Sequence, residues 1–191
     1  NPMDGLFTLN EACLSEIENA LYLIRDNPLP LLMLCPSNFH MPRCKELIDT
    51  VFDCLENGFG FCLLDRLPLE DMTDNEAKSI YWLISQMLGR PVAQKWCDGR
   101  MLYSVTDLGR PSGNGVRPDV TNEEQSFHTD NSYNICPPNI VGLLCLQPSM
   151  SGGLSRVVNM KTVLERMETS NKTNIQRLYR PFVFDRQKEH S

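Results

Sequence analysis

The sequence contains no cluster of basic residues and no long apolar run. Lys and Arg together number 18 against 24 Asp and Glu, which gives a net charge of -6 and a pI near 5.1. Proteins that bind nucleic acids normally carry a basic patch, so this balance argues against such a partner and favours small-molecule chemistry. No apolar run approaches the roughly 20 residues of a membrane-spanning helix, and no basic segment precedes an apolar stretch near the N-terminus. We therefore expect neither membrane association nor a secretion signal.

Cysteine is plentiful, but the C-x-x-C spacing typical of metal and redox motifs is absent. The eight cysteines are scattered, and several occupy apolar positions of expected helices or strands: Cys13, Cys35, Cys44, Cys54, Cys62, Cys97, Cys136 and Cys145. Because cysteine is commonly a small buried hydrophobe, we interpret them as reduced core thiols rather than as disulfides. Reduced thiols indicate a cytoplasmic location.

Internal repeats and low-complexity tracts are also absent. A chain of 191 residues with 41% hydrophobic content is large enough for one globular core, so we predict a single domain over residues 1–191. Capping signals and apolar residues at helical spacing predict four helices, over residues 9–26, 42–56, 73–89 and 160–167. Apolar or alternating runs predict strands over residues 59–64, 100–107, 140–147 and 156–159. This mixture predicts an α+β chain.

A His-x-Asp pair, His128 and Asp130, lies within residues 126–133, which read SFHTDNSY and favour an extended backbone. In a strand, side chains two residues apart leave by the same face, so the imidazole and the carboxylate would project into one space. An open site with two His and one carboxylate is the ligand set of non-haem Fe(II) oxygenases, and this pair supplies two of those three ligands. The other interpretation is a surface histidine beside a turn-forming aspartate.

The residues that follow give this pair a context. After it come Pro137-Pro138, the apolar run over 140–147, and the segment SGGLS over 151–155. This order of HTD, Pro-Pro turn, apolar strand and Gly-Gly-x-Ser/Thr segment resembles the TauD/TfdA family of Fe(II)- and 2-oxoglutarate-dependent oxygenases, over about residues 60–167. The resemblance implies a double-stranded β-helix, the jelly roll shared with cupins, with flanking helices.

The resemblance also implies roles for individual residues. Fe(II) would sit on His128 and Asp130 and would bind the cosubstrate 2-oxoglutarate and then molecular oxygen. Ser155, where Thr is common in the family, would hydrogen-bond 2-oxoglutarate; its other interpretation is a turn serine beside two glycines. Asn131, directly after the metal carboxylate, is expected to face the substrate, and Tyr133 and Tyr103 are further substrate-binding candidates.

The reaction that this family implies is hydroxylation of an aliphatic C–H bond of a small molecule, with release of succinate and carbon dioxide. The substrate stays open among amino-acid-like compounds, sulfonates and other acids. Two other classes of function stay open as well: a non-catalytic jelly-roll binding module that retains HTD, and a cupin-like metalloenzyme that does not use 2-oxoglutarate. The sequence does not indicate an oligomeric state.

Residues 108–124 are rich in Gly, Pro, Asn and charge, directly before the His-x-Asp pair. A long irregular loop in a compact domain is usually functional, so this loop is our candidate for a lid over the substrate. The alternative is a solvated connection without a role.

A second metal-binding histidine is the ligand that the pattern lacks. His190 is the only histidine after His128. In the TauD/TfdA family the distal His lies much further along, and an Arg some ten residues later pairs with 2-oxoglutarate. Residues 180–186 resemble the family's connection into the second half of the barrel. We therefore expect that His190 is not a ligand, that residues 1–191 are the N-terminal part of a longer oxygenase, and that the iron site within them is incomplete.

Overall fold

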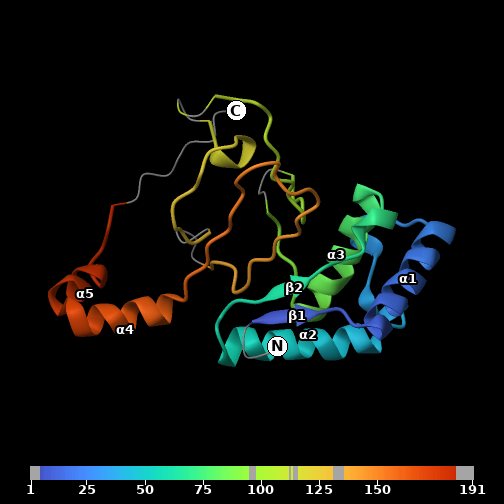
Figure 1. The fold of residues 1–191 in the computed structure, drawn as a ribbon, viewed down its shortest axis with the longest axis horizontal. Helices are drawn as coiled ribbons and strands as arrows, with labels where there is room; N and C mark the ends of the chain where they lie inside the picture. Colours follow the sequence, from blue (N-terminus) through green and yellow to red (C-terminus); the bar gives the residue numbers. More distant parts are fainter. Residues whose placement is uncertain (1–4, 95–97, 112, 114–115, 131–135, 184–191) are drawn as a thin grey trace. The chain divides into compact units, whose positions relative to one another are not determined.

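The computed structural model of the chain describes residues 5–94, 98–111, 113, 116–130 and 136–183. The chain divides into two compact units. We call residues 1–91 with 142–155 the core unit, and residues 92–141 with 156–191 the site unit. Figure 1 shows helices α1 to α3 and both strands in the first of these, and helices α4 and α5 in the second. The prediction of one oxygenase domain over residues 1–191 stays a prediction.

Helix α1 (Glu11–Asp26) confirms the helix predicted over residues 9–26. Its N-cap is Asn10, whose side-chain oxygen accepts a hydrogen bond from the Cys13 backbone N–H at 2.9 Å. Such a cap satisfies one of the backbone amides that the first helical turn leaves unpaired. The apolar residues predicted at helical spacing, Cys13, Ile17, Leu21 and Ile24, are buried, and Ala20 is buried with them.

Helix α2 (Pro42–Asn57) confirms the helix predicted over residues 42–56, but another helix caps it. Glu16 of α1 accepts hydrogen bonds from the backbone N–H groups of Arg43 and Cys44, both at 2.9 Å. A carboxylate is stabilised at a helix N-terminus because the unpaired amides and the helix dipole both favour negative charge there. A side chain of α1 therefore fixes the start of α2.

Helix α3 (Asp74–Leu88) begins with the predicted capping box. The Thr73 backbone N–H donates to Glu76 Oε2 at 2.7 Å, and the Glu76 N–H donates to Thr73 Oγ1 at 3.3 Å. Arg25, in the last turn of α1, donates from Nε to Glu76 Oε1 at 2.7 Å. The same carboxylate therefore closes the cap of α3 and ties that helix to α1. Short 3-10 turns join these helices, namely η2 (Leu31–Met33), η3 (Pro36–Asn38) and η4 (Leu69–Asp71).

Strands β1 (Leu6–Thr8) and β2 (Leu63–Asp65) pair in parallel and form the only sheet in the part of the chain that the structure describes. Phe7 of β1 packs with Val51 and Cys54 of α2, so α2 covers one face of this ribbon. The buried strand predicted over residues 59–64 is wrong in position and in burial, because β2 begins at Leu63 and that side chain is 65% exposed.

The antiparallel jelly roll that the family resemblance implies is not observed among the described residues. No strand forms over residues 100–107, 126–130, 140–147 or 156–159. An extended segment becomes a strand only when its backbone groups pair with a neighbouring strand. These segments leave apolar side chains in solvent, with Leu143 84% exposed and Val157 64% exposed. The strand predictions there are wrong for this structure, while the coarser expectation of a chain with both helices and strands is confirmed.

The site unit consists of irregular chain and short helices. The turn η5 (Pro118–Val120) lies inside the predicted loop over 108–124. Helix α4 (Met160–Ser170) contains the helix predicted over 160–167, and α5 (Lys172–Leu178) follows it. None of the residues described in this unit is buried.

The described cysteines differ in burial, and both buried and exposed cysteines occur in the core unit. Every described cysteine is free, and Cys13, Cys44 and Cys54 are buried in the core unit. Burial raises the pKa of Cys44 and, to about 12, that of Cys62, so both thiols stay protonated and unreactive at neutral pH. The interpretation as core thiols is wrong for the exposed cysteines, Cys35, Cys136 and Cys145, and Cys97 lies outside the described residues. No helix in the described ranges is both long enough and apolar enough to cross a membrane.

Candidate functional site

His128 and Asp130 lie in irregular chain of the site unit, with a bend at Phe127 and a turn at Asp130. His128 Nε2 is 3.5 Å from Asp130 Oδ1, and the two side chains are 53% and 52% exposed. The structure therefore brings the imidazole and the carboxylate together, as the spacing predicted, although a bend and a turn do this in place of a strand.

The ring of His128 is held by the backbone. Its Nδ1 lies 2.7 Å from the carbonyl oxygen of Ser126. A carbonyl oxygen only accepts hydrogen bonds, so in the neutral ring Nδ1 carries the proton and the lone pair is on Nε2, the nitrogen nearer to Asp130. Metal-binding histidines commonly donate their other ring N–H to a backbone carbonyl in this way, which fixes the tautomer and the ring orientation.

The spacing of the two donor atoms is close to that of two tetrahedral ligands of one divalent metal ion and longer than that of two ligands at a right angle. Two atoms that each bind such an ion at about 2.1 Å lie about 3.0 Å apart at a right angle and about 3.4 Å apart at a tetrahedral angle. The observed separation of Nε2 and Oδ1 is 3.5 Å. Within the described residues, no group of three or more His, Cys, Asp or Glu side chains is arranged to hold a metal ion. The described part of the chain thus supplies two protein donors, and His190 lies outside it.

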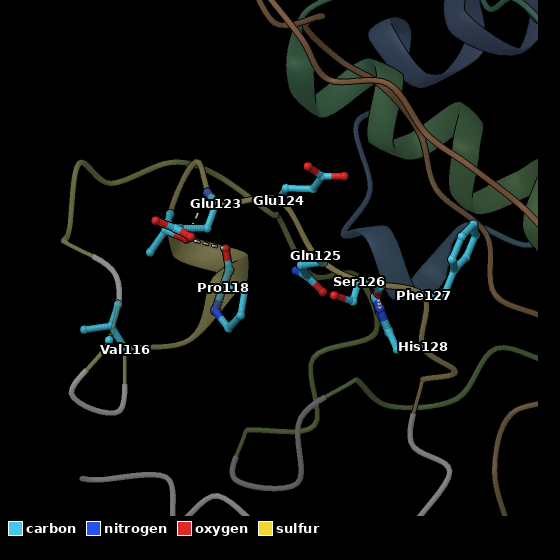
Figure 2. Close-up of a pocket in the computed structure, with 10 residues that line it drawn as sticks. Val116, Pro118, Glu123, Glu124, Gln125, Ser126, Phe127 and His128 are labelled. Atoms are coloured by element: carbon cyan, nitrogen blue, oxygen red, sulfur yellow. Dashed lines mark hydrogen bonds between the residues drawn. The ribbon is translucent and has the colours of Figure 1, made fainter.

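A cavity of about 490 Å³ adjoins His128. Its walls are formed by Gly113, Val116, Pro118, Thr121, Glu123, Glu124, Gln125, Ser126, Phe127 and His128. Figure 2 shows Val116 and Pro118 on the side of η5. Gln125, Ser126 and His128 lie on the segment that leads to Asp130. The volume falls within the range of about 300 to 1,000 Å³ that is usual for small-molecule sites. Part of the predicted loop over 108–124 therefore lines a cavity next to the candidate metal ligand, and its role as a lid stays a prediction.

Tyr103 uses its hydroxyl group inside the site unit. A hydrogen bond to the Asp119 carboxylate is the main cause that raises the pKa of Tyr103. Burial raises the pKa of Asp119, but the hydrogen bonds from Tyr103 and Arg117 outweigh it and leave that pKa below its ordinary value. Arg117 Nε donates to Asp119 Oδ1 at 3.1 Å. Tyr103 thus braces η5, and it is not one of the residues that line the cavity; its role toward the substrate stays a prediction.

Ser155 is exposed at the end of the core unit, whereas His128 and Asp130 belong to the site unit. The two glycines before it have φ of +74° at Gly152 and +68° at Gly153. Such positive φ values favour glycine, and a Cβ on Gly153 would also collide with the side chain of Ser149. The turn before Ser155 therefore requires the Gly-Gly pair of the segment, while the role of Ser155 toward 2-oxoglutarate stays a prediction.

The sequence analysis and the structure differ in the site residues that they identify. Asn131 and Tyr133 lie outside the described residues, so their expected contacts with the substrate stay predictions. The sequence analysis gave no individual role to Glu123, Gln125 or Ser126, which line the cavity. The signal that could have found them is their place directly before His128 in the sequence.

Comparisons with known proteins give the same assignment as the motif. Residues 28–191 match the family model described as "Taurine catabolism dioxygenase TauD, TfdA family". A similar protein is FR-33289 synthase of Streptomyces rubellomurinus, which is 30% identical over 149 residues, or 77% of this chain. The matched residues are 42% of that synthase, so the chain spans less than half the length of this relative. The family that the motif indicated is thereby confirmed. The chain belongs to the taurine catabolism dioxygenase TauD, TfdA family of iron- and 2-oxoglutarate-dependent oxygenases.

Proposed function

We propose that this chain forms part of an Fe(II)- and 2-oxoglutarate-dependent oxygenase that hydroxylates an aliphatic C–H bond of a small molecule and releases succinate and carbon dioxide. The observation that carries the proposal is the pair His128 and Asp130, with Nε2 and Oδ1 3.5 Å apart and with the ring fixed through Nδ1, in a chain of the TauD, TfdA family. An imidazole and a carboxylate on one side of an ion leave its other positions for the cosubstrate and oxygen.

His128 and Asp130 would hold the iron, which when bound supplies the activation of oxygen at the expense of 2-oxoglutarate. The Ser126 carbonyl keeps Nδ1 of His128 protonated, so that Nε2 stays available as a ligand. Ser155 would donate its hydroxyl hydrogen to a carboxylate of 2-oxoglutarate. The cavity beside His128 would orient the substrate, and the apolar side chains of Pro118 and Phe127 in its wall would reduce the access of water.

The test is production of succinate from 2-oxoglutarate by the full-length protein. Amines, amino acids, sulfonates and carboxylic acids are supplied in turn as the prime substrate, with and without Fe(II) and oxygen. The proposal expects succinate release that requires iron, oxygen and a particular substrate. Substrate conversion that does not depend on 2-oxoglutarate would support the cupin-like metalloenzyme instead. A protein that binds metal and small molecules but releases no succinate under any of these conditions would be a binding module.

A further inference from the structure

The cavity beside His128 has an uncompensated negative charge in its wall. Two acidic residues line it, Glu123 and Glu124, and no Lys or Arg is among its lining residues in the described part of the chain. Glu124 is neutralised by Arg156, whose guanidinium nitrogen lies 3.0 Å from Glu124 Oε1. Glu123 has no such ion pair among the described residues, so no basic side chain there neutralises its charge.

Two arginines that adjoin this wall, Arg117 and Arg156, each pair with a carboxylate. Arg117 follows Val116 in the wall, but its Nε donates to Asp119 at 3.1 Å. Arg156 is bound by Glu124. Neither arginine leaves an unpaired charge for an anionic ligand, whereas a carboxylate without a counter-charge attracts cations and repels anions. The charge pattern therefore favours a positively charged ligand over a sulfonate or a carboxylate.

The other residues that line the cavity indicate what the uncharged part of such a ligand would be. Val116, Pro118 and Phe127 offer apolar surface, and Gln125 and Ser126 offer neutral hydrogen-bonding groups. All of them lie in the same cavity as the candidate iron ligand His128. A small molecule with a cationic end and an aliphatic chain would match this lining, and its chain would lie close to His128 and Asp130.

We propose that Glu123 is a specificity-determining residue of this site and that the prime substrate is a small aliphatic compound with a primary ammonium group, which binds the Glu123 carboxylate. This inference rests on the proposed oxygenase function. Of the substrate classes left open by the sequence, it favours amino-acid-like compounds, which carry an ammonium group, over sulfonates and other acids.

The experiment compares three probes of equal chain length, n-pentylammonium, pentan-1-ol and pentane-1-sulfonate. Their affinities for the full-length protein are measured by isothermal titration calorimetry without iron, 2-oxoglutarate or turnover. We expect n-pentylammonium to bind most tightly. Glu123→Gln should weaken its binding about fivefold, the size of one partly exposed charge pair, and should remove the preference over pentan-1-ol. Glu165→Gln, on the exposed face of α4 and outside the cavity, is the matched control and should leave all three affinities unchanged.

Equal affinity of the wild-type protein and Glu123→Gln for n-pentylammonium would overturn the inference, and so would a preference for the sulfonate. Because the binding assay needs no turnover, it separates this inference from the proposed function. Succinate release without ammonium preference would contradict the inference alone. Ammonium preference that depends on Glu123, without succinate release from any substrate, would contradict the proposed function alone.

Discussion

The core unit and the site unit use their apolar side chains in opposite ways. Every buried residue among those described lies in the core unit, and Ile17, Ile80 and Leu83 there are 0% exposed. In the site unit Phe127 is 65% exposed and Val157 is 64% exposed. Because burial of apolar area is the dominant favourable contribution to folding, stability is concentrated in the core unit, whereas the candidate metal ligands His128 and Asp130 lie in the site unit. Substitutions of buried residues in the core unit should therefore change stability, and substitutions of the exposed candidate ligands should change function without changing stability.

The largest expected effect on stability is in the core of α3. Leu83→Ala removes most of a side chain that is 0% exposed and should lower the free energy of unfolding by about 2 to 5 kcal/mol. Chemical denaturation of the full-length protein measures this loss. Affinity for Fe(II) under native conditions should not change, and a large loss of iron affinity in Leu83→Ala would show that the two units are not energetically separate.

The next effect concerns the cosubstrate and should leave stability unchanged. Ser155→Ala removes one hydrogen bond to a charged ligand, worth about 1.5 to 3 kcal/mol, and should raise the concentration of 2-oxoglutarate required roughly tenfold to a hundredfold. Metal affinity should change less. Ser151→Ala, in the same segment, is the control. An unchanged requirement for 2-oxoglutarate in Ser155→Ala would remove this residue from the site.

A pH dependence is expected from the capping box of α3. The hydrogen bond from the Arg25 side chain, followed by that from the Thr73 backbone, lowers the pKa of Glu76 from 4.5 to about 2. A carboxyl whose pKa is lower in the folded state stabilises the fold above its unfolded pKa, and this contribution is lost as the pH falls from about 4.5 toward 2. Glu76→Gln should cost about 1 kcal/mol at neutral pH and should flatten the dependence in that window. Urea denaturation at several pH values tests this, with the exposed Glu18→Gln as control; an unaltered pH profile in Glu76→Gln would contradict it.

The smallest expected effect comes from making the same substitution, Val to Thr, in each of the two units and comparing the losses of stability. Val157→Thr in the site unit changes a side chain that is 64% exposed and should alter the free energy of unfolding by less than about 0.5 kcal/mol. Val51→Thr in the core unit places a hydroxyl group at a position that is 7% exposed and should cost about 1 to 3 kcal/mol. Equal costs for the two variants, measured by thermal or chemical denaturation, would contradict the division into a stabilising unit and a functional unit.

The sequence predicted what depends on neighbouring residues. The capping box of Thr73 and Glu76 and the helix that follows it are local, and so is the spacing that brings His128 and Asp130 together. The cap of α2 was missed because Glu16 lies on another helix, more than twenty residues before the amides that it binds. The predicted strands failed because a strand requires a pairing partner, which no local pattern specifies.

The candidate site shows the same limit. The motif identified the two metal donors, but the importance of Glu123 depends on a long-range ion pair. Arg156 pairs with Glu124, and this pairing is what leaves Glu123 as the unpaired charge in the cavity wall. The sequence order of two adjacent glutamates cannot indicate which of them an arginine will neutralise.

The central claim is that His128 and Asp130 hold the iron. The most direct measurement is anaerobic equilibrium dialysis of Fe(II) against the full-length protein and its variants. Two histidine variants serve as matched controls. His40→Ala removes an exposed histidine of the core unit, and His190→Ala removes the histidine that we expect not to be a ligand.

The account predicts that the wild-type protein, His40→Ala and His190→Ala bind Fe(II) with the same affinity. His128→Ala and Asp130→Ala should lose this binding while they retain the unfolding free energy of the wild type. Fe(II) binding by folded His128→Ala with wild-type affinity would contradict the account.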